Sequence, residues 1–391
     1  MRKKKFPYLI LLFLFYVCNL AGQPTNSFSE GNNHTERVES PSSDLAYEFY
    51  IEKLNQQTPL DLIYNKEVKF YIDQFLGGRR NELVQSLSRS GKYFPVIEEI
   101  LDRYDLPLEL KYMAVIESGL NPLAKSKSGA IGLWQFLYNT CSLVDLEVNS
   151  YIDERRDPYK STEAACRYLE YLYDTFHDWN LVLAGYNGGP GEVRKAIERS
   201  GGKTDFWEIR PYLSVQTRNY VPAFIAMNYL MNNYEDHGIY FDKSVYNNRN
   251  IDTLHIDYAI SFNQISLVLD ISESTLIELN PIYKRKYIPD LDQPCILILP
   301  KETIADYLRY ENMIIGFILP KSNYNTLLAN AGNTCNREKI LHVVSHGEFF
   351  HKIAINYHCT FENIKAWNKL DNLTLIPGQI LEIWIENNKE K

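Results

Sequence analysis

The sequence predicts a multidomain protein, in which an all-α domain is followed by two small α+β modules of the order strand, helix, helix, strand. Three observations carry this prediction. Apolar residues recur at helical spacing between about residues 46 and 240, where no strand pattern stands out. After residue 250 the pattern changes to short β-like runs. The last of these runs repeat an earlier stretch of the chain.

Length and composition fit a globular protein of two or three domains. The chain has 391 residues, of which 45% are hydrophobic and 23% are charged. With 41 basic and 49 acidic residues the formal net charge is −8. An acidic chain lacks the general basic surface on which nucleic-acid binding depends, so we expect no nucleic-acid partner.

Residues 1–22 have the pattern of a signal peptide. Arg2 and three lysines form the basic start, an apolar run extends from Tyr8 to Val17, and small residues precede position 23. The run is too short to cross a bilayer comfortably, although an uncleaved anchor is the alternative. Cys18 leaves lipidation open, but bulky residues precede it. Residues 23–45 are polar and are expected to form a disordered leader.

The helical domain is expected to span residues 46–240. Ile97, Ile100, Leu101 and Tyr104 recur on one helical face before a break at Pro107. A later helix is predicted to begin with Ser161 as its N-cap.

The two α+β modules are predicted at residues 253–300 and 341–385, with a connector at 301–340. Three dipeptides match between them, at an offset of 87 residues for the first and 88 for the other two. The pairs are Leu254-His255 with Leu341-His342, Leu279-Asn280 with Trp367-Asn368, and Ile288-Pro289 with Ile376-Pro377. Each copy is therefore expected to fold as one unit.

Cysteine and histidine patterns give little support for a disulfide framework or a metal site. The odd number of cysteines after residue 22 argues against a framework, although one pair, Cys141 with Cys166, is possible in an oxidising compartment. No CxxC motif occurs. A histidine-rich cluster in the last module matches no zinc spacing, so we expect no metal. The cluster comprises His342, His346, His351, His358 and Cys359.

Glu117 is the candidate for acid chemistry. It follows four apolar residues near the end of a predicted helix, which Gly119 and Pro122 terminate. Partial burial of a carboxyl group beside apolar neighbours raises its pKa. A carboxylic acid that is still protonated near neutral pH is what cleavage of a glycosidic bond requires. The alternative is an ordinary surface glutamate in the last turn of an amphipathic helix.

Several motifs follow Glu117 in a fixed order. Ser126 lies nine residues after Glu117 and Gln135 eighteen residues after it, at the end of the segment 128–135. A Gly-rich segment at 184–191 and a segment at 217–222 come later. The candidate site residues in and around these motifs are Glu117, Ser118, Ser126, Gln135, Tyr186, Asn187 and Tyr220.

With these motifs, residues 60–235 resemble the lytic transglycosylase domain of the membrane-bound lytic murein transglycosylase D family, which is related to goose-type lysozyme. Residues 341–385 resemble a LysM module, and residues 253–300 look like a degenerate copy that lacks the counterpart of Gly347-Glu348. The resemblance implies an all-α lysozyme-like catalytic domain followed by two LysM-type modules. It also implies a lyase that needs no cofactor and cleaves peptidoglycan with formation of 1,6-anhydro ends.

The resemblance assigns roles to the motif residues. Glu117 is expected to be the catalytic acid and then base, while Ser118, Ser126, Gln135, Tyr186, Asn187 and Tyr220 are expected to bind substrate. Several purely structural roles stay open: a turn cap for Ser126, a backbone-orienting residue for Gln135 and core packing for Tyr186. Tyr220 faces the groove or packs beneath it. One departure from the family pattern is Gln216, where the family often has glutamate.

The last module is expected to bind N-acetylglucosamine-containing glycans in a shallow groove. The residues assigned to it are Gly347, Glu348, Asn372, Ile376 and Pro377. The expected partner is the peptidoglycan glycan strand, and the protein is expected to be a monomer with peripheral or no membrane contact after signal cleavage. We expect secretion across the inner membrane to the periplasm or cell envelope, including its outer-membrane side.

Two alternatives to a transglycosylase stay open from the sequence. A muramidase on the same scaffold would need a second carboxylate near Glu117, for which Asp153, Glu154 and Asp157 are candidates. A catalytically inactive peptidoglycan-binding protein would rely on its LysM modules alone.

Overall fold

A computed structural model describes residues 44–242, 250–316 and 337–386, with short gaps at 346–347, 349, 358–363, 366 and 371–374. The chain divides into two compact units. The first comprises residues 1–148 and 154–245, and the second comprises residues 149–153 and 246–391. The predicted signal peptide and nearly all of the predicted leader lie outside the described residues, so both stay predictions.

The described part of the first unit is helical. Its α-helices are α1 (Asp44–Asn55), α2 (Lys66–Leu76), α3 (Arg80–Arg103), α4 (Lys111–Ser118), α5 (Pro158–Phe176), α6 (Trp179–Gly188), α7 (Pro190–Arg199), α8 (Phe206–Ile209) and α9 (Val215–Asn233). Short 3₁₀ turns at 108–110, 138–143, 154–156, 210–212 and 235–237 connect them. The prediction of an all-α domain is confirmed.

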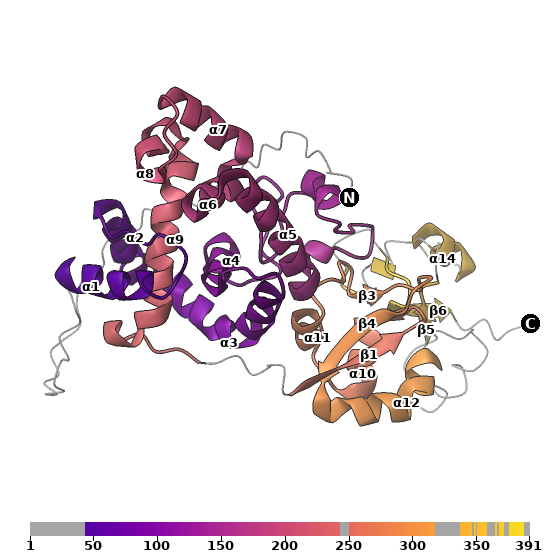
Figure 1. Ribbon diagram of the computed structural model, residues 1–391. Helices are drawn as coiled ribbons and strands as arrows, with labels where there is room; N and C mark the ends of the chain where they lie inside the picture. The colour runs from indigo at the N-terminus through magenta and orange to yellow at the C-terminus, as the bar shows by residue number, and fades with distance from the viewer. Residues whose placement is uncertain are drawn as a thin grey trace, which may run out of the picture. The chain divides into compact units, whose positions relative to one another are not determined.

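The short helix α4 lies in the middle of this unit, and α3, α5, α6 and α9 surround it (Figure 1). Tyr112, Met113, Ala114 and Val115 of α4 are all buried, and they pack in one hydrophobic core with residues of the surrounding helices. Because an apolar helix of eight residues is unstable alone, packing rather than propensity keeps α4 helical. The residues at the carboxyl end of α4 are therefore held in place by a helix that is itself buried in the core.

The start of α5 differs from the prediction. The side chain of Asp157 accepts hydrogen bonds from the backbone N–H groups of Tyr159 and Lys160, and Pro158 occupies the first helical position. The expected N-cap, Ser161, is buried inside the helix, so that prediction is wrong by four residues. Proline is preorganised for a first turn and aspartate is a strong cap, so this pair outcompetes the serine.

The second unit contains two modules, each built around one pair of antiparallel strands. In the first, β1 (Ile251–Ile256) pairs with β4 (Cys295–Pro300), and α10 (Phe262–Leu269) and α11 (Glu273–Leu279) lie between them in the chain. The short strands β2 (Ile260–Ser261) and β3 (Tyr287–Ile288) pair with each other, and α12 (Ile304–Gly316) follows β4. In the second module, β5 (Arg337–Val343) pairs with β6 (Ile380–Glu386), and α14 (Phe350–Asn356) lies between them.

One pair of hydrogen bonds from an asparagine side chain occurs in both modules and explains part of the sequence repeat. The Asn280 side chain donates to the carbonyl oxygen of Ile298 at 2.8 Å and accepts from its N–H at 2.7 Å. The Asn368 side chain makes the same two contacts with Glu382, at 2.8 and 2.6 Å. Each asparagine thus ties the helical segment to the last strand of its own module. The predicted internal repeat is confirmed at the level of these contacts.

Cys141 and Cys166 are buried thiols, so the possible disulfide between them is absent. Within the described residues, every helix is too short or too polar to span a bilayer.

Candidate active site

Glu117 lies in the last turn of α4, close to where the helix stops. Gly119 adopts a left-handed conformation, with φ of +59°, and its N–H donates to the carbonyl oxygen of Val115 at 2.8 Å. This is the usual way in which glycine terminates a helix. The predicted end of the helix is therefore confirmed, and Glu117 sits at the point where the chain leaves the core.

Among the residues that the structure describes, the carboxyl group of Glu117 has one side-chain hydrogen-bond partner, Tyr220 of α9. The Tyr220 hydroxyl donates to Oε1 of Glu117 at 2.9 Å, and the Tyr220 side chain is buried. Glu117 itself keeps part of its surface exposed, as a group that must reach a substrate needs. The sequence left open whether Tyr220 faces a groove or packs beneath it, and the structure places it beneath Glu117.

Burial raises the pKa of Glu117 to about 8, and the hydrogen bond from Tyr220 lowers it only in part. No charged side chain of the described residues adds to this shift. Burial also raises the pKa values of the Tyr220 and Tyr186 hydroxyls well above the ordinary value for tyrosine. All three groups are consequently neutral near pH 7, and Glu117 can deliver a proton.

The loop after α4 is fixed to the helix by hydrogen bonds to its backbone. The Ser118 hydroxyl lies 3.0 Å from the carbonyl oxygen of Leu133, and the Tyr186 hydroxyl donates to the carbonyl oxygen of Trp134 at 2.9 Å. The indole N–H of Trp134 in turn donates to Thr162 of α5 at 2.9 Å. Three separate segments, which carry Ser118, Thr162 and Tyr186, therefore hold residues 133 and 134 in place.

Two further predicted residues make contacts within this loop. Gln135 is buried with φ of +52°, and its amide N–H₂ contacts the carbonyl oxygens of Gly132 and Ala124 at 2.9 and 3.3 Å. The Ser126 hydroxyl accepts from the N–H of Ala130 at 3.0 Å and keeps part of its surface exposed. The structural roles weighed for both are thus present, and their binding of substrate stays a prediction.

Gly132 allows a close approach that no other residue could make. Its φ is +91°, and a Cβ atom added there would lie 1.7 Å from the carbonyl oxygen of Arg155. The Arg155 guanidinium meanwhile donates to the carbonyl oxygen of Phe136 at 3.2 Å. The sequence analysis did not identify Arg155 or Thr162 as residues that support the site, because neither belongs to a motif. For Thr162 the signal was Trp134, since a buried indole N–H needs a hydrogen-bond acceptor.

Among the described residues, the side chains of Asn187 and Gln216 each carry a buried polar atom without a hydrogen-bond partner. For Asn187 this is Oδ1, and for Gln216 it is Nε2. Asn187 precedes Gly188 in α6, and Gln216 precedes Thr217 in α9. The two helices pack closely at this point, since a Cβ atom added to Gly188 would lie 2.4 Å from the Thr217 hydroxyl. An acceptor and a donor are thus left unused where these helices meet.

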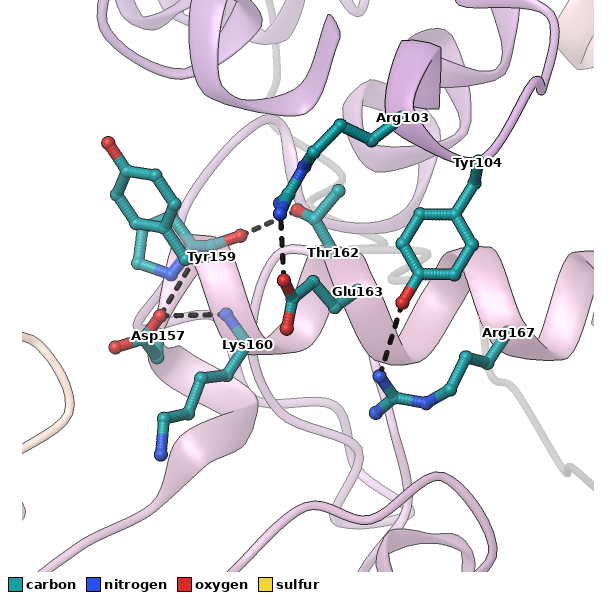
Figure 2. A network of polar contacts seen from close by, with 9 residues as sticks. Arg103, Tyr104, Asp157, Tyr159, Lys160, Thr162, Glu163 and Arg167 are labelled. Carbon is teal, nitrogen blue, oxygen red and sulfur yellow. Dashed lines mark hydrogen bonds and ion pairs between the residues drawn. The ribbon is translucent and has the colours of Figure 1, made fainter. Parts of the chain in front are cut away.

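The candidate second carboxylates have other partners. Glu154 is buried and paired with Lys160, and its Oε2 accepts from the N–H of Glu147 at 2.7 Å. Asp157 caps α5, and Figure 2 shows it beside Tyr159 and Lys160. Asp153 belongs to the second unit. Glu154 and Asp157 are thus engaged near the start of α5, and among the described residues no carboxylate hydrogen-bonds to Glu117.

In the last module, His342 connects Glu348 to Tyr357. The His342 ring lies 2.8 Å from Oε2 of Glu348 and 3.0 Å from the Tyr357 hydroxyl, and the same carboxylate oxygen accepts from the N–H of Ser345 at 2.8 Å. Glu348 therefore has a structural role at the start of the module. Ile376 and Pro377 are partly exposed, whereas Gly347 and Asn372 lie outside the described residues.

Within the described ranges, no group of three or more histidine, cysteine or acidic side chains is placed to hold a metal ion. Much of the histidine-rich cluster, including His346, His358 and Cys359, lies outside those ranges.

Three family models match the chain in the predicted order. They are the transglycosylase SLT domain at residues 95–208, the lytic transglycosylase MltD LysM-like domain at 250–314, and the LysM domain at 342–384. The chain is therefore a helical SLT domain followed by LysM-type modules, and the predicted fold class is confirmed.

Curated relatives agree with the domain matches. Over 299 residues the chain is 30% identical to membrane-bound lytic murein transglycosylase D of Escherichia coli strain K12, covering 75% of this chain and 64% of that protein. The chain thus spans slightly less than two thirds of this relative. The soluble lytic murein transglycosylase of the same strain is 33% identical over 118 residues, which cover 28% of this chain and 18% of that one.

The crystal structure of the 70 kDa soluble lytic transglycosylase from E. coli matches with a TM-score of 0.34 and 21% identity, covering 51% of this chain and 31% of that chain.

Proposed function

We propose that the chain belongs to the membrane-bound lytic murein transglycosylase D family and that it is a peptidoglycan lytic transglycosylase. It cleaves the β-1,4 bond between N-acetylmuramic acid and N-acetylglucosamine without water and leaves 1,6-anhydro-N-acetylmuramic acid ends. The enzyme is a carbon–oxygen lyase, and the reaction needs no cofactor.

The observation that carries this proposal is the state of Glu117. Its pKa of about 8 keeps the carboxyl group protonated at neutral pH, and within the described part of the chain its one side-chain hydrogen-bond partner is the neutral Tyr220 hydroxyl. Glu117 protonates the oxygen of the glycosidic bond as this bond breaks. The resulting carboxylate then accepts the proton of the C6 hydroxyl while the C6 oxygen bonds to C1.

A single carboxylate suffices for this sequence of steps. The nucleophile is part of the substrate, so no second carboxylate has to activate water or form a glycosyl-enzyme bond. The engagement of Glu154 and Asp157 at the start of α5 supports this route over a muramidase.

The other motif residues are proposed to serve substrate binding in two ways. Ser126, which is partly exposed, contacts the substrate directly. Ser118, Gln135 and Tyr186 act mainly by holding the loop that lines the groove, since their polar atoms contact its backbone. The side-chain oxygen of Asn187 has no hydrogen-bond partner, and we propose that it accepts one from the bound glycan once α6 and α9 have shifted.

The LysM modules are proposed to bind peptidoglycan glycan strands and keep the enzyme at its substrate. Gly347, Asn372, Ile376 and Pro377 form the proposed groove of the second module, and Glu348 supports it through His342. Two tethered modules would raise the local concentration of the enzyme at the cell wall. We further propose that residues 1–22 direct secretion, that the mature protein works as a monomer in the periplasm or cell envelope, and that the domain boundaries are those given by the sequence.

The test is mass analysis of the muropeptides that the purified protein releases from peptidoglycan. We expect products with 1,6-anhydro ends, one water lighter than reducing sugars, and none from Glu117→Gln. Glu48→Gln, which removes an exposed carboxylate from α1, should release the same products as wild type. Reducing ends would assign a muramidase instead. Retention on peptidoglycan without release would assign a binding protein.

A further inference from the structure

The backbone that follows Glu117 is held by a cation from a different helix. Arg89 lies in α3, and its Nη1 donates to the carbonyl oxygen of Gly119 at 2.9 Å. Gly119 comes two residues after Glu117, so this contact fixes the peptide at which α4 ends. Arg89 precedes Gly119 by 30 residues and belongs to none of the sequence motifs.

The carbonyl of Gly119 has a physical reason to attract a cation. Gly119 is the left-handed residue directly after α4, so its carbonyl takes part in no intrahelical hydrogen bond, and it lies at the carboxyl end of the helix, which carries partial negative charge. A Cβ atom on Gly119 would lie 3.4 Å from the Ser86 hydroxyl and 3.7 Å from Nη1 of Arg89. Helix α3 therefore packs directly against the turn that ends α4, and Arg89 reaches it from there.

The guanidinium of Arg89 points to a backbone carbonyl rather than to a carboxylate. Within the described residues, no carboxylate pairs with its guanidinium, and the carbonyl of Gly119 is its hydrogen-bond partner. Arg103, on the same helix, provides the contrast: its guanidinium pairs with Glu163 at 3.1 Å (Figure 2). The contact of Arg89 is thus directed at the catalytic helix, whereas that of Arg103 is directed at the side of α5.

We propose that Arg89 is a positioning residue for Glu117, which acts by fixing the carboxyl end of α4. Three contacts then constrain Glu117 and its surroundings: Tyr220 on its carboxyl group, Ser118 on the loop beside it, and Arg89 on the backbone after it. This inference rests on the proposed role of Glu117 as the acid. The reacting atoms must be closely aligned with the Glu117 carboxyl group. If the Gly119 backbone becomes more mobile, the rate of the chemical step therefore falls more than the affinity for substrate does.

The test compares Arg89→Met, Arg89→Lys and the matched control Arg103→Met in steady-state assays on soluble glycan strands. We expect Arg89→Met to lower kcat by about 10- to 100-fold, with KM within about twofold, because misplacement costs the chemical step. Arg89→Lys keeps the charge and one donor and should recover most of kcat. Arg103→Met should match wild type. Equal losses in both methionine variants, or a loss confined to KM, would overturn the proposal.

A second measurement does not depend on activity. Amide hydrogen exchange reports the N–H groups of Gly119 and Leu120, which donate to the carbonyl oxygens of Val115 and Ala114. Both should exchange faster in Arg89→Met, by about tenfold or more, and by an intermediate factor in Arg89→Lys. Unchanged exchange in the two variants would overturn the positioning role. Exchange that changes as expected in a protein without 1,6-anhydro products would leave the contact in place and reject the proposed reaction.

Discussion

Replacement of Glu117 by glutamine should stabilise the folded protein, and the gain should grow with pH. The carboxyl group has a pKa of about 8 in the folded protein and about 4.5 when unfolded. Between these values the native state binds a proton that the unfolded state has released, so the free energy of unfolding of the wild type falls as pH rises. Glutamine has no such proton and does not lose this stability.

The size of the effect follows from the same numbers. A difference of 8 − 4.5 = 3.5 pKa units, at about 1.36 kcal/mol per unit, sets a ceiling of about 5 kcal/mol above pH 8. Because Glu117 is partly exposed, water screens part of this cost, and we expect about 2 kcal/mol. Below pH 4.5 the carboxyl group is neutral in both states, and the two proteins should unfold at nearly equal free energy.

The assay is urea unfolding of the wild type and Glu117→Gln at a series of pH values between 4 and 9. The difference between the two proteins isolates one carboxyl group from all others that titrate. Glu48→Gln, at an exposed position of α1, should change the free energy of unfolding by less than about 0.5 kcal/mol at every pH. A Glu117→Gln protein that is less stable than wild type at pH 8, or a difference that stays constant with pH, would refute the reasoning.

Further predictions concern the contacts around this carboxyl group and in the modules. Tyr220→Phe removes a hydrogen bond that favours the ionised form of Glu117, so the alkaline limb of kcat/KM should move up by about one pH unit, a shift of ~1.4 kcal/mol. Gly132→Ala should lower the free energy of unfolding by about 3 kcal/mol or more, because its Cβ would meet the backbone of Arg155. Asn280→Ala should accelerate amide exchange along β4, because it removes two hydrogen bonds of the buried Asn280 side chain, which are worth about 1–3 kcal/mol together.

Each of these predictions has a matched control. Tyr186→Phe, whose hydroxyl donates to Trp134 rather than to Glu117, should leave the alkaline limb in place. Gly129 has a φ similar to that of Gly132, but nothing lies within 4 Å of a Cβ added to it. Gly129→Ala should therefore lower the free energy of unfolding by only about 1 kcal/mol. Asn368→Ala should accelerate exchange in β6 but not in β4. Equal effects in a variant and its control would contradict the corresponding contact.

The sequence predicted well those features that depend on neighbours along the chain. Gly119 ends the helix of Glu117 as expected, because a left-handed turn favours glycine and needs no distant partner. The repeat that includes Asn280 and Asn368 was visible because each module folds around the same local contact. The prediction of a local feature was wrong where two cap signals competed: Asp157, rather than Ser161, caps the start of α5.

Contacts between distant segments could not be predicted in the same way. Tyr220 is 103 residues away from Glu117, and its motif showed only that it belongs to the site. Its position below the carboxyl group depends on how α9 packs against α4, which no spacing encodes. Arg89 carried no signal at all, because a single arginine on an amphipathic helix is ordinarily a solvated residue.

The environment of Glu117 suits a group that must act first as an acid and then as a base. At pH 7 a pKa of about 8 leaves about ten protonated molecules for each ionised one, so the acid is ready before substrate binds. After the proton is transferred, the same desolvation makes the carboxylate a far stronger base than a glutamate in water, so that in the proposed reaction it removes the C6 proton within the same encounter. A second carboxylate beside Glu117 would place two negative charges in one desolvated space. The neutral partners around Glu117 therefore favour a reaction that one carboxyl group completes alone.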